Sequence, residues 1–314
     1  MTIKDLPKIK DVNISIEKLS GYNFPDYDGE ISVDSFVEEN VKILTDEFGF
    51  IFSPLWPLKQ EVFTFNFFRV REVDSFQNIS LIREHSYPPI QITSMGRCNF
   101  PNYPVFYCSN DPLTALLEVV RDNNITNKKY CISKWEFQPT VDELYFQTFL
   151  QTELPSDNFF NELKKQLIKK IDQPFEKSFN KKLDKDRKDG ILKYLEFLDS
   201  IFIDNKNLSL SASLAHRSLY ANHNLRTDIL MYPSIQTNKK GVNLAINPNF
   251  AENNLKLTRL YEVSLQKYES KTGKIDLSFH RYADVKRDMI VFKHLKKTDI
   301  DFKNSVKTDF EIEL

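Results

Sequence analysis

Alternating apolar and polar positions predict a series of short strands along this chain. Aromatic residues alternate with polar ones in the run that contains Phe65 and Phe67, which predicts a strand over 61–71. Residues 128–137 alternate in the same way, short apolar runs predict strands over 105–108, 228–235 and 241–246, and further strand-like runs lie over 257–267, 275–283 and 287–294. Helical patterns interrupt these strands, so the expected fold class is α+β.

Helical periodicity is clearest near the N-terminus. Apolar residues recur at helical spacing over 35–48, where Asp34 can cap the helix and Gly49 stands at the C-terminal glycine position. A second helix is expected over 209–223. Residues 1–30 show no sustained period and are predicted to form an extended arm.

Residues 139–208 differ in character from the segments on either side. They predict two amphipathic helices separated by a basic run from Lys177 to Lys188, and we interpret them as a solvated helical insertion. A partner-binding or nucleic-acid-binding face is the alternative, but a single aromatic residue, Phe179, lies among the lysines, which disfavours a nucleic-acid interface there. The expected organisation is an N-terminal extension with one helix (1–60), a core (61–265) that carries the insertion, and added strands (266–314).

Composition and charge narrow the function classes. The 314 residues are 41% hydrophobic and 28% charged, which is ordinary for a globular protein with one sizeable core. The formal net charge of −1 implies no overall attraction to nucleic acid or to an anionic membrane. Three cysteines without metal-ligand spacing favour a reduced, cytoplasmic compartment and no metal site, and we find no signal peptide or membrane span.

The stretch from Gly96 to Val119 places three chemically useful side chains close together in sequence. Arg97 lies in a loop, Tyr107 lies in a short strand, and Glu118 lies on a helix whose start is marked by Pro112. A cation, an aromatic ring and a carboxylate indicate a site for a charged ligand that carries a ring. At 100° per residue, Glu118 falls away from the apolar stripe of its helix, so its default place is the solvated surface.

Five sequence pieces, taken in order, resemble the RES domain, which is named for its arginine, glutamate and serine. The pieces are Phe68-Arg69-Val70, Gly96-Arg97-Cys98-Asn99, Val105-Phe106-Tyr107, Thr114-Ala115-Leu116-Leu117-Glu118-Val119, and Tyr232-Pro233-Ser234 followed by Gly241-Val242-Asn243-Leu244. The resemblance covers about 61–135 and 210–250. Cys98 stands where the family usually has an aromatic residue, and Asn102 stands where a glycine is common.

This resemblance implies an ADP-ribosyltransferase-like α+β fold and chemistry on NAD as the substrate. Such proteins are commonly toxins that degrade NAD and are neutralised by a partner antitoxin protein. Carried over residue by residue, the resemblance assigns the site to Arg97, Tyr107, Glu118 and Ser234, with Arg69 and Asn243 as secondary candidates.

Each residue type suits its assigned role. Glu118 would stabilise the positive ribose in the oxocarbenium-like transition state, and Arg97, with Arg69, would bind the diphosphate. Tyr107 would stack on nicotinamide, and Ser234 would hydrogen-bond the ligand. No GxSxG motif surrounds Ser234, which disfavours a role as a nucleophile.

Several functions are compatible with these site residues. The first is NAD hydrolysis to nicotinamide and ADP-ribose, and the second is ADP-ribosylation of a macromolecule. Arginine-modifying transferases commonly carry an acidic or amide residue two places before the catalytic glutamate, where this chain has Leu116. Phosphorolysis of NAD and a non-catalytic binding module on the same fold are the further alternatives.

Overall fold

A computed structural model of the chain describes residues 6–53, 55–59, 61, 66–120, 125, 127–148, 159–171, 173–179, 181–203, 207–221, 226–237, 240–269, 274–296 and 298–313. The fold is mixed α+β, and 42% of the described residues are helical and 28% lie in strands. The chain forms two compact units whose segments alternate along the sequence. Unit 1 comprises Met1–Trp56, Thr93–Tyr103 and Tyr145–Pro233, and unit 2 comprises Pro57–Ile92, Pro104–Leu144 and Ser234–Leu314.

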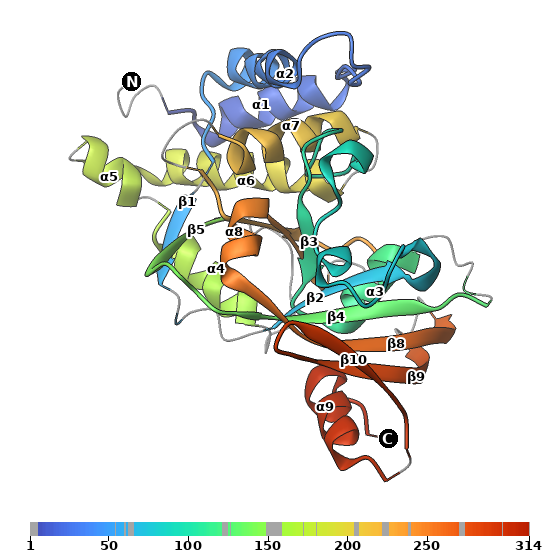
Figure 1. Cartoon of the computed structure of the whole chain (residues 1–314). Helices are drawn as coiled ribbons and strands as arrows, with labels where there is room; N and C mark the ends of the chain where they lie inside the picture. The colour runs from blue at the N-terminus through green and yellow to red at the C-terminus, as the bar shows by residue number, and fades with distance from the viewer. Residues whose placement is uncertain are drawn as a thin grey trace. The chain divides into compact units, whose positions relative to one another are not determined.

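Unit 1 is built mainly of helices. They are α1 (Ile9–Ser20), α2 (Val33–Phe48), α4 (Phe159–Lys169), α5 (Gln173–Phe179), α6 (Lys185–Ile203) and α7 (Leu208–Leu219). Helices α1 and α6 pack on each other, as do α2 and α7 (Figure 1). The segment that leads into α1 passes close to α6 at Gly190. A Cβ at Gly190 would lie 2.7 Å from the Pro7 carbonyl oxygen, so the absence of a side chain permits this approach.

The N-terminal region contains one helix more than the sequence pattern predicted. Helix α2 agrees with the prediction for 35–48, and Gly49 ends it in the left-handed conformation at φ 75°, although Ser32 rather than Asp34 is its cap. The predicted extended arm is wrong, because α1 occupies much of it. The buried stripe of α1 is short, and one of its three members is Ser15, so the period was too weak to recognise.

Strands also enter unit 1. Strand β5 (Glu143–Thr148) pairs in parallel with β6 (Ile229–Pro233), and β1 (Leu55–Lys59) lies on the other side of β5. β5 corrects the expectation that 139–208 is helical throughout. Its polar residue Gln147 is buried and accepts a hydrogen bond from the Thr227 hydroxyl at 3.0 Å, a tertiary contact that the local sequence does not indicate.

Unit 2 is built on strands in the order β7-β3-β2-β4-β8-β9-β10. They are β2 (Phe67–Glu72), β3 (Phe106–Ser109), β4 (Tyr130–Phe137), β7 (Val242–Ile246), β8 (Leu255–Glu269), β9 (Lys274–Lys286) and β10 (Met289–His294). Neighbouring strands in this order are antiparallel. The predicted strands therefore occur close to their expected places, although most of the run before Phe67 lies outside the described residues.

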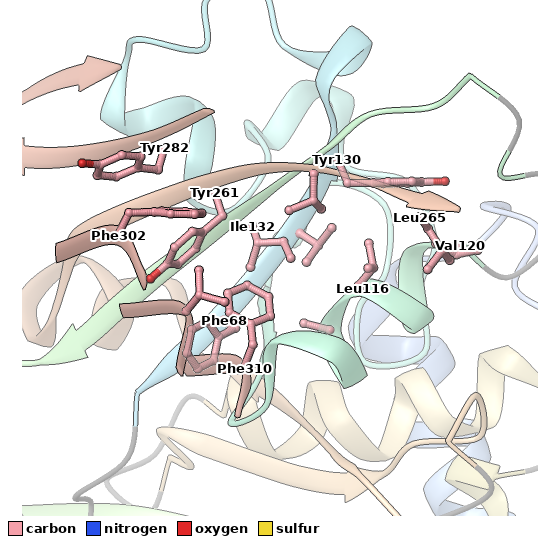
Figure 2. Close-up of a cluster of buried hydrophobic side chains, with 14 residues drawn as sticks. Phe68, Leu116, Val120, Tyr130, Ile132, Tyr261, Leu265, Tyr282, Phe302 and Phe310 are labelled. Carbon is pink, nitrogen blue, oxygen red and sulfur yellow. The ribbon is translucent and has the colours of Figure 1, made fainter. Parts of the chain in front are cut away.

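The core of unit 2 lies between this sheet and two helices, α3 (Pro112–Val120) and α9 (Ile300–Phe310). Figure 2 shows Phe68, Ile132 and Tyr261 from three adjacent strands beside Leu116 of α3 and Phe310 of α9. Helix α9 was not predicted, since only strands were expected after residue 266. The remaining helix of unit 2 is α8 (Pro248–Asn254).

In the part of the chain described above, we find no helix with the length and apolar character needed to cross a membrane.

Candidate functional site

The register of β3 and β7 places several candidate residues on one face of the unit 2 sheet. Ser109 pairs with Asn243, and Tyr107 pairs with Ala245. Directly paired residues share a face, as do residues two apart on a strand. Phe68 pairs with Ser109 and packs in the same cluster as Leu116 of α3, so this is the face that α3 covers.

Helix α3 carries Glu118 toward that face. The helix begins as the sequence predicts, with Asp111 Oδ1 accepting a hydrogen bond from the Thr114 amide at 2.5 Å. Glu118 lies near the end of the helix and is half-buried. Its default place in the sequence interpretation was the solvated surface, and the structure instead gives its carboxylate buried partners.

Glu118, Ser234 and Asn243 form a hydrogen-bonded cluster. Glu118 Oε1 accepts from the Ser234 hydroxyl at 2.6 Å and from Asn243 Nδ2 at 2.8 Å. Ser234 is fully buried and Asn243 is 5% exposed. Two donors on one carboxylate oxygen fix the orientation of the glutamate, and the cluster joins residues more than 100 positions apart in the sequence.

The loop before β7 holds Ser234 in place. Ser234 directly follows β6, and its amide donates to the Gly241 carbonyl oxygen at 3.0 Å. The Gly241 amide donates in turn to Thr237 Oγ1 at 2.8 Å. Ser109 secures the other end of the same segment, because its hydroxyl donates to the Val242 carbonyl oxygen at 2.8 Å. Sequence reasoning missed Ser109, since nothing local distinguishes it from an ordinary strand-end serine.

Tyr107 and Arg69 lie on adjacent strands, but their side chains lie on opposite faces of the sheet. Tyr107 is half-buried and shares the sheet face of Asn243. Arg69 follows Phe68 on β2, so the strand pleat directs its side chain to the opposite face. There its guanidinium lies 5.6 Å from the Phe106 ring centroid, and its Nη1 donates to the Tyr107 backbone carbonyl oxygen at 2.9 Å. Arg69 is therefore not part of the Glu118 cluster.

Arg97 belongs to unit 1 and lies in a tight turn. The backbone groups of Gly96 and Asn99 bond to each other, at 3.0 and 3.4 Å, on either side of Arg97 and Cys98. The Arg97 guanidinium donates through Nη1 to the Phe202 carbonyl oxygen. Asn102 adopts φ 66°, a left-handed conformation that asparagine tolerates better than most residues.

Cys108 and Cys131 add no reactive thiol to the site. Burial raises the pKa of Cys108 and of Cys131, which keeps both thiols protonated. Over the described residues, no group of three His, Cys, Asp or Glu side chains could hold a metal ion. The chemistry that the cluster itself can offer is a fixed carboxylate, which can stabilise positive charge that develops on a neighbouring ligand.

Comparison with models of known protein families, and with curated protein sequences, finds no match for this chain.

Proposed function

We propose that this protein is an NAD glycohydrolase. The reaction breaks the bond between nicotinamide nitrogen and ribose carbon, and water supplies the oxygen that replaces it, giving nicotinamide, ADP-ribose and a proton. The observation that carries the proposal is the hydrogen bonding of Glu118 by Ser234 and Asn243. The sequence resemblance to the RES domain had singled out these residues from two of its five pieces, which lie more than 100 positions apart.

Glu118 has the catalytic role in this proposal. As the nicotinamide leaves, positive charge develops on the ribose, and a carboxylate held in a fixed orientation stabilises that charge better than a mobile one. Ser234 and Asn243 act through Glu118 as positioning residues, which revises the ligand contact first expected for Ser234. Tyr107 shares their sheet face and offers a ring for stacking. The assignment of Arg97 to the diphosphate rests only on the resemblance to the RES domain.

Leu116 favours hydrolysis over transfer to a protein arginine. It occupies the place where arginine-modifying transferases commonly have an acidic or amide side chain. In this chain Leu116 is fully buried in the core of unit 2 (Figure 2), so it offers no polar group to an acceptor. ADP-ribosylation of another macromolecule stays the second candidate.

The resemblance also supports a biological setting for the enzyme. We propose that the core has the RES fold and that the protein works in the cytoplasm as a toxin. A neutralising antitoxin protein would then be its partner, and the enzyme would need NAD but no metal ion.

The direct test is to incubate the purified full chain with NAD and to measure nicotinamide release. We expect release by the wild type and a fall of at least about 100-fold for Glu118→Gln, which keeps the size of the side chain and removes its charge. Glu38→Gln is the matched control, because Glu38 is an exposed glutamate on helix α2. It should behave as the wild type does.

Three results would reject the proposal. If the wild type releases no nicotinamide, the enzyme proposal fails and a binding module is favoured. If Glu118→Gln releases as much as the wild type, the catalytic role of Glu118 fails. If nicotinamide appears while labelled ADP-ribose stays attached to protein or nucleic acid, transfer replaces hydrolysis.

A further inference from the structure

A cavity of about 710 Å³ lies within unit 2 on the sheet face opposite to the Glu118 cluster. Arg69 of β2 and Trp135 of β4 line it, and their register places both on the same face, because Phe67 pairs with Trp135 and lies two residues from Arg69. Tyr87, Pro88 and the start of β8 complete its wall. The volume is typical of a small-molecule site.

Arg69 is a cation that the protein leaves without an acidic partner among the described residues. Its Nη1 bonds to a backbone carbonyl oxygen, and its buried Nε has no hydrogen-bond partner within the same residues. Burial is the main cause that lowers the pKa of Arg69 to about 10, with a contribution from the charge of Arg71. The side chain therefore still carries its charge at neutral pH, and an anion in the cavity would offset the cost of burying it.

The other charged residues of the cavity balance, because Arg71, Arg83 and Lys256 are matched in number by Glu84, Glu252 and Asp288, so the excess positive charge of the wall equals that of Arg69. Glu84 is paired with Arg71 at 3.6 Å, and Glu252 accepts from the Tyr87 hydroxyl at 3.2 Å. Arg83 is exposed on a short 3-10 turn (Ile82–His85) and lines the cavity, as does the exposed Lys256. Neither has an acidic partner in the described parts of the chain.

The uncharged part of the wall is aromatic and apolar. Trp135 is 5% exposed, and the edge of its ring system is fixed by a hydrogen bond from Nε1 to the Ser133 hydroxyl at 3.1 Å. Tyr87 is half-buried and is held by Glu252. Pro88 continues this surface. A wall of this kind suits a flat ring, while guanidinium groups suit phosphate oxygens through paired N–H donors.

We propose that this cavity is a second ligand site, separate from the Glu118 cluster, and that it binds a nucleoside monophosphate. The phosphate would lie against Arg69 and Arg83, and the base would lie against Tyr87 and the neighbouring apolar wall. Nothing in this assignment depends on NAD cleavage.

The test is calorimetric titration of the full chain with AMP, with adenosine and with inorganic phosphate. AMP is expected to bind at least about tenfold more tightly than either part alone, because each part occupies only half of the site. Arg83→Ala should weaken AMP binding about tenfold. Arg83 is exposed, so this variant is expected to fold, and Arg69→Lys is a second variant that keeps the charge but loses the paired donors.

Control variants separate this site from the proposed NAD site. Arg217→Ala removes an exposed arginine on α7 and should leave AMP binding unchanged. Glu118→Gln should also retain it, even if it abolishes nicotinamide release. The proposal is overturned if AMP binds no more tightly than phosphate, if Arg83→Ala and Arg69→Lys both bind AMP as the wild type does, or if Glu118→Gln abolishes AMP binding.

Discussion

Glu118 differs from an ordinary surface glutamate in what surrounds its carboxylate. An exposed carboxylate is hydrated and mobile, whereas Glu118 Oε1 is bonded to two side chains that are themselves buried. Burying a serine hydroxyl or an asparagine amide without a partner would cost stability, so each of the three side chains benefits from the contact. The hydrogen bonds of the cluster therefore hold the carboxylate in one orientation.

His85 illustrates how burial at a single residue links stability to pH. It is 1% exposed, its Nε2 lies 2.8 Å from the Ile79 carbonyl oxygen, and burial is the main cause that lowers its pKa to about 4. In the unfolded chain a histidine has a pKa of about 6.5. The unfolded state therefore binds a proton that the folded state does not. Stability is full above about pH 6.5 and falls, by about 3 kcal/mol, as the pH drops toward 4.

Replacing His85 should remove this part of the acid sensitivity. We expect the free energy of unfolding of His85→Gln, measured by urea titration, to fall less than that of the wild type between about pH 6.5 and 4.5. His280→Gln, at a half-buried histidine of β9, is the control and should follow the wild-type curve. If His85→Gln loses as much stability as the wild type over this range, the assignment is wrong.

At the scale of elements, the close approach of α3 to the start of β7 sets the geometry of the candidate site. Gly241 precedes β7, and a Cβ at this position would lie 2.5 Å from Thr114 Oγ1 and 2.7 Å from Thr114 Cγ2. Thr114 is buried on α3, one turn before Glu118. The absence of a side chain at Gly241 therefore lets the strand that carries Asn243 lie close to the helix that carries Glu118.

Gly241→Ala should separate these two elements. We expect a loss of about 1–3 kcal/mol in the free energy of unfolding, the usual range for overpacking, together with slower nicotinamide release. Thr114→Ala removes the two atoms in closest conflict, so the double variant should recover at least half of the stability lost by Gly241→Ala. A double variant as unstable as the sum of the two single variants would show that this contact is not the cause.

Local patterns predict the strand-turn-helix segment that leads to Glu118, because Asp111 and Pro112 mark a helix start and the apolar run before them is too short for a helix. They did not predict α1 or α9. In α9 the buried apolar residues are Phe302, Val306 and Phe310, spaced by four, and most of the other residues are polar or charged. Packing against the sheet stabilises such a helix, and packing cannot be derived from local periodicity.

For the whole molecule, the sequence pattern does not indicate which distant segments pack together. The segments of the two units alternate, and Thr93–Tyr103 belongs to unit 1 while the residues that follow it belong to unit 2. The resemblance assigned Glu118, Ser234 and Asn243 to one site, but it did not indicate the hydrogen bonds that join them. It also named Arg69 for the same site, and only the register of β2 shows that its side chain lies on the other face.

The central claim is that a glutamate positioned by Ser234 cleaves NAD, and a double-mutant cycle on nicotinamide release tests it most directly. Ser234→Ala should lower kcat about tenfold in the wild-type background by freeing the carboxylate, and it should have no further effect in a Glu118→Gln background. Strong coupling between the two positions is the expected result. The claim is contradicted if Ser234→Ala lowers kcat equally in both backgrounds, or if Glu118→Gln releases nicotinamide as fast as the wild type does.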